Sequence, residues 1–164
     1  MEKKLAKAFN EQINHEFYSA YLYLAMSAWA ETQDLPGMAH WLQAQAKEET
    51  EHGMKLFAYL NDCGQAVALK AIGEPPAEFG SALELFEQVR AHEAKVTSLI
   101  HKLYALARET ADPAAEVFLQ WFVSEQVEEE KNAADIVAML KRVKPDSAAL
   151  LMIDRQLAKR GEDD

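Results

Sequence analysis

Four long stretches of this sequence carry an apolar stripe at helical spacing, and polar residues interrupt each stripe near its middle. In the clearest case, steps of three and four residues run through Met38, Leu42, Glu49, His52 and Leu56. Glu49 and His52 lie three residues apart, so on a helix they share the otherwise apolar face. A buried carboxylate needs a partner, because burying an unpaired charge is costly. A Glu-x-x-His pair inside a helix bundle can hold iron or manganese if other helices add carboxylates at the same level.

The other stripes supply such residues. Glu16 interrupts the first stripe and Glu93 the third, while Gln126 and Glu129 interrupt the fourth with the spacing of the Glu-x-x-His pair. The stripes predict four long helices and a short fifth helix. We place them at residues 4–32, 36–63, 81–111, 113–143 and 147–159.

The connections between the helices indicate the topology. Residues 32–37 form a short turn with Pro and Gly, so the first two helices should be antiparallel neighbours. Asp112 and Pro113 combine an N-cap with a first helical residue and separate the third and fourth helices. Residues 64–80 show no helical period; extended, they reach up to about 55–60 Å, whereas a helix as long as the second measures about 42 Å. We therefore expect an all-α, up-down four-helix bundle with one long crossover, in a single domain over residues 1–164.

The two halves of the chain repeat each other at an offset of 77 residues. Such self-similarity predicts two helical hairpins that face each other about a pseudo-twofold axis. The polar interruptions should then converge at one level of the core. The matched pairs are Glu16 with Glu93, Glu48 with Glu125, Glu49 with Gln126, and His52 with Glu129.

The converging residues suit a site for two cations. Glu16, Glu49, Glu93 and Glu129 would carry four negative charges, which two divalent cations would balance, with Glu49 and Glu129 central enough to bridge them. Without metal, carboxylates in a dry core repel each other and take up protons. Oxygen ligands with one imidazole suit Fe²⁺ or Mn²⁺ and can also bind Zn²⁺. The alternative is that these residues are solvated charges on irregular helical faces. That would explain a single glutamate in a stripe, but it explains five residues in register less well than a metal site does.

Neighbouring residues allow two interpretations each. Glu48, Glu125 and Glu128 lie one step around the helices and form either a weaker third cation site or an ordinary solvated surface. Tyr23, on the first stripe, and Trp121, close in sequence to the fourth-helix ligands, are either electron donors to an oxidised metal or core packing.

The composition limits the partners. A net charge of −10 argues against nucleic acid or an anionic membrane as the main partner and fits attraction of cations. Cys63 is the only cysteine, so neither an internal disulfide nor a four-cysteine metal site is possible. The chain starts with a charged amphipathic stretch that has no apolar signal core, and no apolar run of about 18 residues follows. We expect a protein of the reducing cytoplasm.

The same residues carry a family resemblance. The sequence resembles the bacterial and archaeal non-haem ferritins over nearly its whole length, in residue type, spacing and helix order. The expected bundle is therefore ferritin-like, with the short fifth helix near a symmetry axis of an assembly. The segments that carry the resemblance are Asn14–Tyr23, Glu48–His52, His92-Glu93 and Phe118–Glu130.

The resemblance implies a ferroxidase that serves iron storage and detoxification. Fe(II) would bind at two positions, O₂ would oxidise it to Fe(III), and hydrated ferric oxide would collect in a hollow shell, usually of 24 subunits. The family pattern assigns the first iron to Glu16, Glu49 and His52, and the second to Glu49, Glu93 and Glu129 with Gln126 beside them. It assigns a third site to Glu48, Glu125, Glu128 and Glu129, and a central tyrosine to Tyr23.

Related and unrelated classes can be weighed against this reading. A bacterioferritin would have a second Glu-x-x-His where this chain has Gln126 and Glu129, and a haem-ligating Met where it has Thr50, so we expect no haem. A rubrerythrin would need more cysteines, and a mini-ferritin would lack the fifth helix. A centre with one His should hold Fe(III) loosely, which favours passing iron onward. A small di-iron or di-manganese oxidase or peroxidase without mineral storage is the main alternative, whereas a structural or signalling bundle would have no use for five ligands in register.

Overall fold

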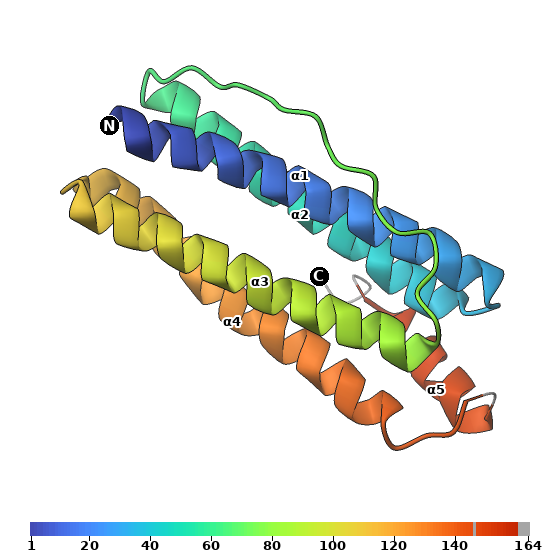
Figure 1. The fold of residues 1–164 in the computed structure, drawn as a ribbon. Coiled ribbons are helices and arrows are strands. Elements are labelled where there is room, and N and C mark those ends of the chain that lie inside the picture. The colour runs from blue at the N-terminus through green and yellow to red at the C-terminus, as the bar shows by residue number, and fades with distance from the viewer. Residues whose placement is uncertain (146, 161–164) are drawn as a thin grey trace.

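The computed structural model describes residues 1–145 and 147–160, and these residues form five helices and no strand (Figure 1). The expected all-α bundle with one long crossover and a short fifth helix is confirmed. The helices are α1 (Lys3–Thr32), α2 (Pro36–Asp62), α3 (Ala82–Glu109), α4 (Pro113–Leu140) and α5 (Ala148–Leu157).

The third and fifth helices begin at N-caps, Ser81 and Ser147, which are the first residues of the expected ranges. The Ser81 hydroxyl accepts the N–H of Glu84 at 3.3 Å, and the Glu84 carboxylate accepts the N–H of Ser81 at 2.8 Å. The Ser147 hydroxyl accepts a backbone N–H of α5 at 3.3 Å. These side chains satisfy N–H groups that a helix start leaves free. At its other end α5 stops at Leu157 rather than at 159, in a turn.

Two long helices end earlier than predicted: α3 ends at Glu109 rather than 111, and α4 at Leu140 rather than 143. Ala111 has a φ of 50°, a left-handed conformation through which a helix does not continue. Beyond α4, the N–H groups of Arg142 and Val143 bond carbonyls three residues back, at 3.1 and 3.3 Å. The chain thus tightens into a turn. The remaining helix ends agree with the prediction to one residue.

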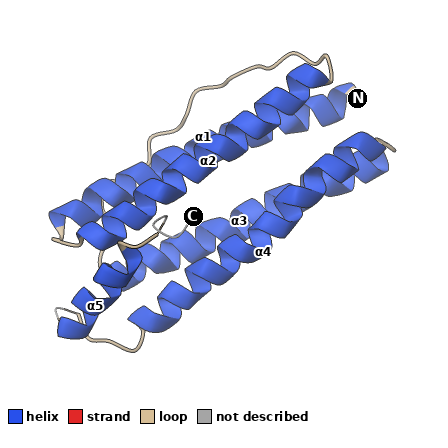
Figure 2. Cartoon of the chain, turned by 180° about the vertical axis from the view of Figure 1, so that it is seen from behind, coloured by secondary structure: helices blue, strands red, loops and turns tan. Residues whose placement is uncertain are grey.

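Two helical hairpins make up the bundle. Helices α1 and α2 pair along their length, as do α3 and α4, and between the hairpins α1 lies closest to α3. The crossover runs along the outside of the α1–α2 hairpin, so α2 and α3 point the same way (Figure 1). Asn10 holds the crossover to α1, because its side-chain oxygen accepts the N–H of Ala68 at 2.6 Å. Helix α5 lies across the end of the bundle, away from the N-terminus (Figure 2).

Two apolar clusters fill the bundle, one at each end. The first lies around the N-terminal half of α1 and the C-terminal half of α2 and includes Phe9 and Leu60. The second includes Trp41 and Phe86 and extends to Ile153 of α5. Buried polar residues lie between the clusters along each long helix. The apolar ends therefore fix the helices in register on both sides of a polar layer.

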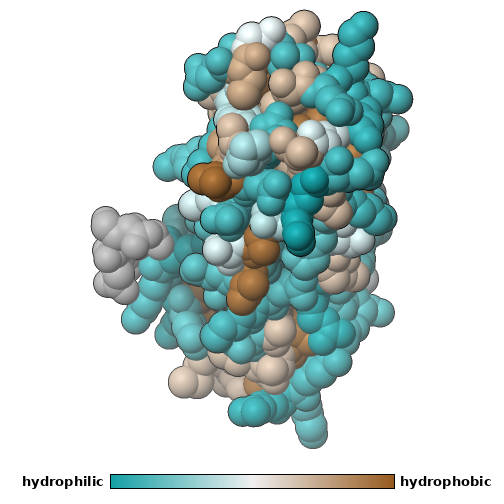
Figure 3. Space-filling model, turned by 90° about the vertical axis from the view of Figure 1, so that its left-hand side faces the viewer, coloured by the Kyte–Doolittle hydropathy of each residue, from teal (hydrophilic) through white to brown (hydrophobic). Residues whose placement is uncertain are grey.

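One face of the outer surface is largely hydrophilic (Figure 3). Figure 3 shows one face on which apolar side chains are scattered among polar ones. Within the described residues, none of the helices combines the length and apolarity needed to cross a bilayer.

Helix α5 is attached to the start of α2. The N-cap of α2 is Leu35, which has no side-chain acceptor, and the N–H of Met38 instead donates to Asp154 of α5 at 2.8 Å. Asp154 is buried, so this bond between a carboxylate and a helix N-terminus is shielded from water. Gly37 permits the approach, because a Cβ there would lie 1.8 Å from the carbonyl oxygen of Asp154.

Substituting Gly37 should therefore displace α5. We expect Gly37→Ala to lower the free energy of unfolding by about 1–3 kcal/mol, the usual cost of overpacking, and to lower the thermal midpoint accordingly. Gly73→Ala is the matched control, because a Cβ there meets only Tyr18, at an ordinary 3.7 Å. Equal thermal midpoints for the two variants would contradict the tight contact between α2 and α5.

Candidate metal centre

Each of the four long helices contributes to a buried polar layer at mid-height. Its six members are each at most 5 % exposed, although five of them are acidic or basic. The layer consists of Glu16 from α1, Glu49 and His52 from α2, Glu93 from α3, and Gln126 and Glu129 from α4.

Three of these residues form a group with metal-ligand geometry. Glu16, Glu49 and His52 each offer a ligand atom, and these atoms all lie within 4.8 Å of one another. Nδ1 of His52 lies 3.6 Å from Oε2 of Glu49. Glu16 is oriented by Gln12, whose amide donates to its Oε1 at 2.8 Å. The residues predicted to hold the first iron are thus brought together.

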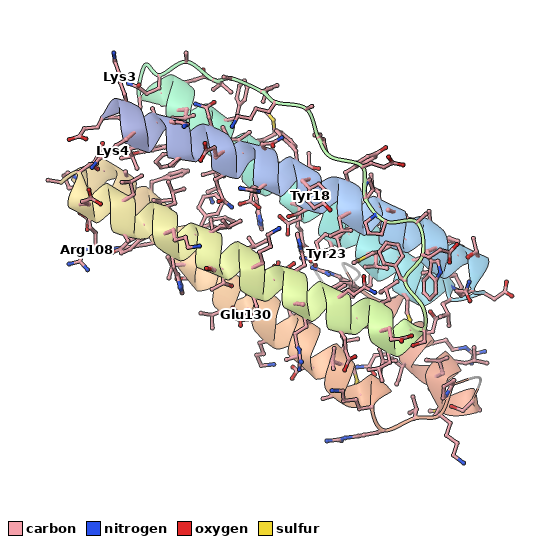
Figure 4. The ribbon with its side chains drawn as sticks, viewed as in Figure 1. Lys3, Lys4, Tyr18, Tyr23, Arg108 and Glu130 are labelled. Carbon is pink, nitrogen blue, oxygen red and sulfur yellow. The ribbon has the colours of Figure 1, made fainter. Side chains whose placement is uncertain are left out.

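The other half of the layer is held by hydrogen bonds between helices. The hydroxyl of Tyr23 donates to Oε1 of Glu93, and Figure 4 shows the tyrosine pointing between the hairpins. The amide of Gln45 donates to Oε2 of Glu129 at 2.7 Å. Gln126 accepts from the hydroxyl of Thr97 at 3.0 Å, so its side chain is fixed on the α3 side. Within the described residues, Glu93 and Glu129 do not form a second group whose ligand atoms lie as close together as those around Glu49.

Several carboxylate oxygens in this layer lack a partner. Both oxygens of Glu49 and Oε2 of Glu93 are buried and receive no hydrogen bond from the described residues. Buried polar groups are normally satisfied, and an orphaned carboxylate is among the costliest exceptions. The unpaired oxygens face a set of oxygen donors with one imidazole, which is the donor set of Fe²⁺ or Mn²⁺. The residues around Glu49 therefore fit a divalent cation.

The electrostatics agree with this geometry. Burial, and then the negative charge of Glu49, raise the pKa of Glu16 well above its usual range. Burial and the charge of Glu93 do the same for Glu49. Burial likewise raises the pKa of Glu93 and of Glu129 to about 7, and for Glu129 the charge of Glu93 adds to it. Without a cation, the cluster relieves its repulsion by holding protons.

The two aromatic candidates for electron donation, Tyr23 and Trp121, differ in their surroundings. Tyr23 is fully buried and bonded to Glu93, and burial raises its pKa, so its phenol keeps its proton. Trp121 is 38 % exposed, and its ring lies edge-on to His52 with centroids 5.3 Å apart. The ammonium of Lys55 lies 3.2 Å from the centre of the tryptophan ring. Of the two, Tyr23 is the residue that is hydrogen-bonded to a predicted ligand, whereas Trp121 packs against one.

The outer acidic residues are less buried. Glu48 and Glu125 are half-buried and Glu128 is exposed. Glu48 forms an ion pair with Arg160, a residue that follows α5. Within the described residues, the outer acids do not form a group with ligand atoms within 4.8 Å of one another. A third cation site stays a prediction.

Sequence reasoning missed the residues that orient the ligands. Gln12 and Gln45 each precede a ligand by four residues on the same helix face, so their spacing could have revealed them. Thr97 likewise lies four residues after Glu93. Arg160 offers no such local signal, because it reaches the layer only through the path of α5.

A helix bundle whose apolar core holds a layer of buried carboxylates with one histidine is typical of helical-bundle metalloproteins, and comparisons with known proteins narrow the class. A family model described as a ferritin-like domain matches residues 6–143. The chain is 42 % identical to a bacterial non-heme ferritin of Staphylococcus saprophyticus, over all of this chain and 98 % of the relative. It is 37 % identical to the bacterial non-heme ferritin of Staphylococcus aureus, over all of this chain and 99 % of that protein.

Solved structures agree. The fold matches an open-pore ferritin from Archaeoglobus fulgidus with a TM-score of 0.96 and 44 % identity, over 98 % of this chain and 99 % of that one. An engineered closed form of the same archaeal ferritin matches with a TM-score of 0.96 and 45 % identity, over 98 % of each chain. The chain belongs to the ferritin family.

The raised pKa values predict how the metal-free protein responds to pH. Glu93 and Glu129 ionise near pH 7 when folded but near 4.5 when unfolded, so between these values the folded state binds more protons. Stability then falls as pH rises. We expect the thermal midpoint of the chelator-treated protein to fall by several degrees between pH 5 and pH 8. A midpoint that rises over this range would contradict the buried acid cluster.

Proposed function

We propose that this protein oxidises Fe(II) to Fe(III) with O₂ at a dinuclear centre and stores the product as ferric oxyhydroxide within a hollow oligomer. The observation that carries the proposal is the unpartnered, fully buried carboxylate of Glu49 beside Glu16 and His52. A carboxylate in that position is stabilised only by protons or by cations, and Fe(II) is the cation that fits both the donor set and the family. Non-heme ferritins are the relatives that match over the full chain.

The residues divide between two iron positions. Glu16, Glu49 and His52 would hold the first iron, and Glu49, Glu93 and Glu129 the second, with Gln126 beside it. Glu49 would bridge, which fits its central place and the raising of its pKa by Glu93. The hydroxyl of Tyr23 holds Glu93 in place and is close enough to the centre to supply an electron. Glu48, Glu125, Glu128 and Glu129 would form a third, weaker position.

Two Fe(II) would each give one electron to the same O₂, which would take up two protons and leave as H₂O₂, and the two Fe(III) would move on to the mineral. A centre with four carboxylates and one imidazole holds protons when metal is absent, so release of Fe(III) is coupled to protonation of the buried glutamates. This arrangement favours turnover of iron as substrate over its retention as a cofactor. No haem is expected, since Thr50 stands where a haem-ligating methionine would be.

The proposal also covers the domain organisation, the assembly and the location of the protein. Residues 1–164 would act as one ferritin-like domain, and 24 copies would form the shell. A cytoplasmic location fits a chain whose single cysteine, Cys63, needs no oxidising compartment.

Removing Glu49 tests the centre. We expect Glu49→Ala to lower the initial rate of aerobic Fe(II) oxidation by at least a hundredfold, because both iron positions lose a ligand, while helicity and assembly persist. Glu51→Ala is the matched control, since Glu51 is exposed and, among the residues that the structure describes, pairs only with Lys47 on its own helix. Absorbance of Fe(III) after mixing would report the rate. An unchanged rate in the Glu49 variant would remove this residue from the site.

Iron loading tests storage. The purified protein would receive excess Fe(II) in air, pass through size exclusion, and have its iron counted per chain. We expect hundreds of irons per large particle, because a shell accumulates mineral beyond its binding sites. Two or three irons per chain on a small oligomer would instead identify a di-iron oxidase or peroxidase without storage.

A further inference from the structure

Arg160, just beyond α5, folds back onto the helix that carries Glu49 and His52. Its Nη1 donates to Oε1 of Gln45 at 2.6 Å, and its Nη2 pairs with Glu48. The guanidinium also lies 4.4 Å from the centre of the Trp41 ring, which suits a cation–π contact. The Arg160 carbonyl lies 3.0 Å from Nε2 of His40. The side chain is only 17 % exposed, so these contacts fix it firmly against α2.

Gln45 connects this arginine to the metal centre. It is fully buried, and while its oxygen accepts from Arg160, its nitrogen donates to Oε2 of Glu129 at 2.7 Å. A guanidinium only donates hydrogen bonds and a carboxylate only accepts them. The amide between them therefore has one satisfactory orientation. With its oxygen turned toward Glu129, two acceptors would face each other in a dry core.

We propose that Arg160 is a positioning residue for the iron centre: through the amide of Gln45 it fixes the carboxylate of Glu129 in the orientation that receives the second cation. This inference rests on the proposed function, because it assumes that Glu129 binds iron. One oxygen of Glu129 is occupied by Gln45, which leaves the other for the metal. Hydrogen-bonding partners of this kind commonly change metal affinity by roughly tenfold to hundredfold.

The geometry of the contact requires an arginine. The planar guanidinium reaches Gln45 and Glu48 with separate nitrogens while it lies over Trp41. A lysine would bring a single ammonium and no planar group to stack. Arg160→Lys therefore keeps the charge and loses the shared hydrogen bonds.

The test uses the assembled, metal-free protein titrated with Co²⁺, whose visible absorption reports each bound equivalent. In Arg160→Ala we expect the second Co²⁺ to bind about tenfold to hundredfold more weakly and the first to stay within about twofold. The matched control is Arg155→Ala, which removes the same charge from an exposed position on α5. In stopped-flow oxidation, the Fe(II) concentration at half-maximal rate should rise while the maximal rate is largely retained. Arg160→Lys should behave like Arg160→Ala.

A double variant tests the route through Gln45. Gln45→Leu removes the donor to Glu129, so adding Arg160→Ala to it should weaken the second Co²⁺ no further. Additive effects would overturn the inference. So would an Arg160→Ala or Arg160→Lys titration that matches that of Arg155→Ala. A parent protein that binds two Co²⁺ per chain but oxidises no Fe(II) would overturn the proposed function instead. If Arg160→Ala does not assemble, Arg160→Lys decides.

Discussion

The main constraint on this structure is the mutual repulsion of four carboxylates that are buried in one layer of the core. Glu49 has no hydrogen-bond donor among the described residues, and its charge raises the pKa of Glu16. A core of this composition is unfavourable unless protons or cations enter it. The layer suits divalent metal because several of its carboxylate oxygens lack hydrogen-bond donors from the part of the chain that the structure describes. The apolar clusters above and below supply stability that offsets the cost of burying them.

Hydrogen bonds from neighbouring side chains orient the carboxylates of the polar layer. Three of the four glutamates each accept a hydrogen bond from their own donor: Gln12 for Glu16, Tyr23 for Glu93 and Gln45 for Glu129. These donors hold one oxygen of each carboxylate, and the other oxygen of Glu93 is buried without a partner. Of the four glutamates, only Glu49 has no donor among the described residues, so both of its oxygens are left for protons or a cation.

The sequence allowed the ligand layer to be predicted because long, uninterrupted helices keep their register. Once Glu16 and Glu49 lie on apolar faces and the repeat pairs the hairpins, their level in the bundle follows. Helix ends were less predictable, since local features such as the positive φ of Ala111 decide them. The place of Arg160 could not be predicted, because it depends on the docking of α5 through Asp154 and Gly37, residues distant in sequence.

The long crossover keeps the two hairpins near each other. Each hairpin is closed by a short turn, and the long helices contact each other more within a hairpin than between hairpins. The crossover acts as a tether that holds the two halves at high effective concentration. Glu16 and Glu49 belong to one half and Glu93 and Glu129 to the other, so each half carries its own pair of like charges, and docking joins the two pairs into one layer. Protons or cations that neutralise this layer therefore favour the docked halves over separated ones.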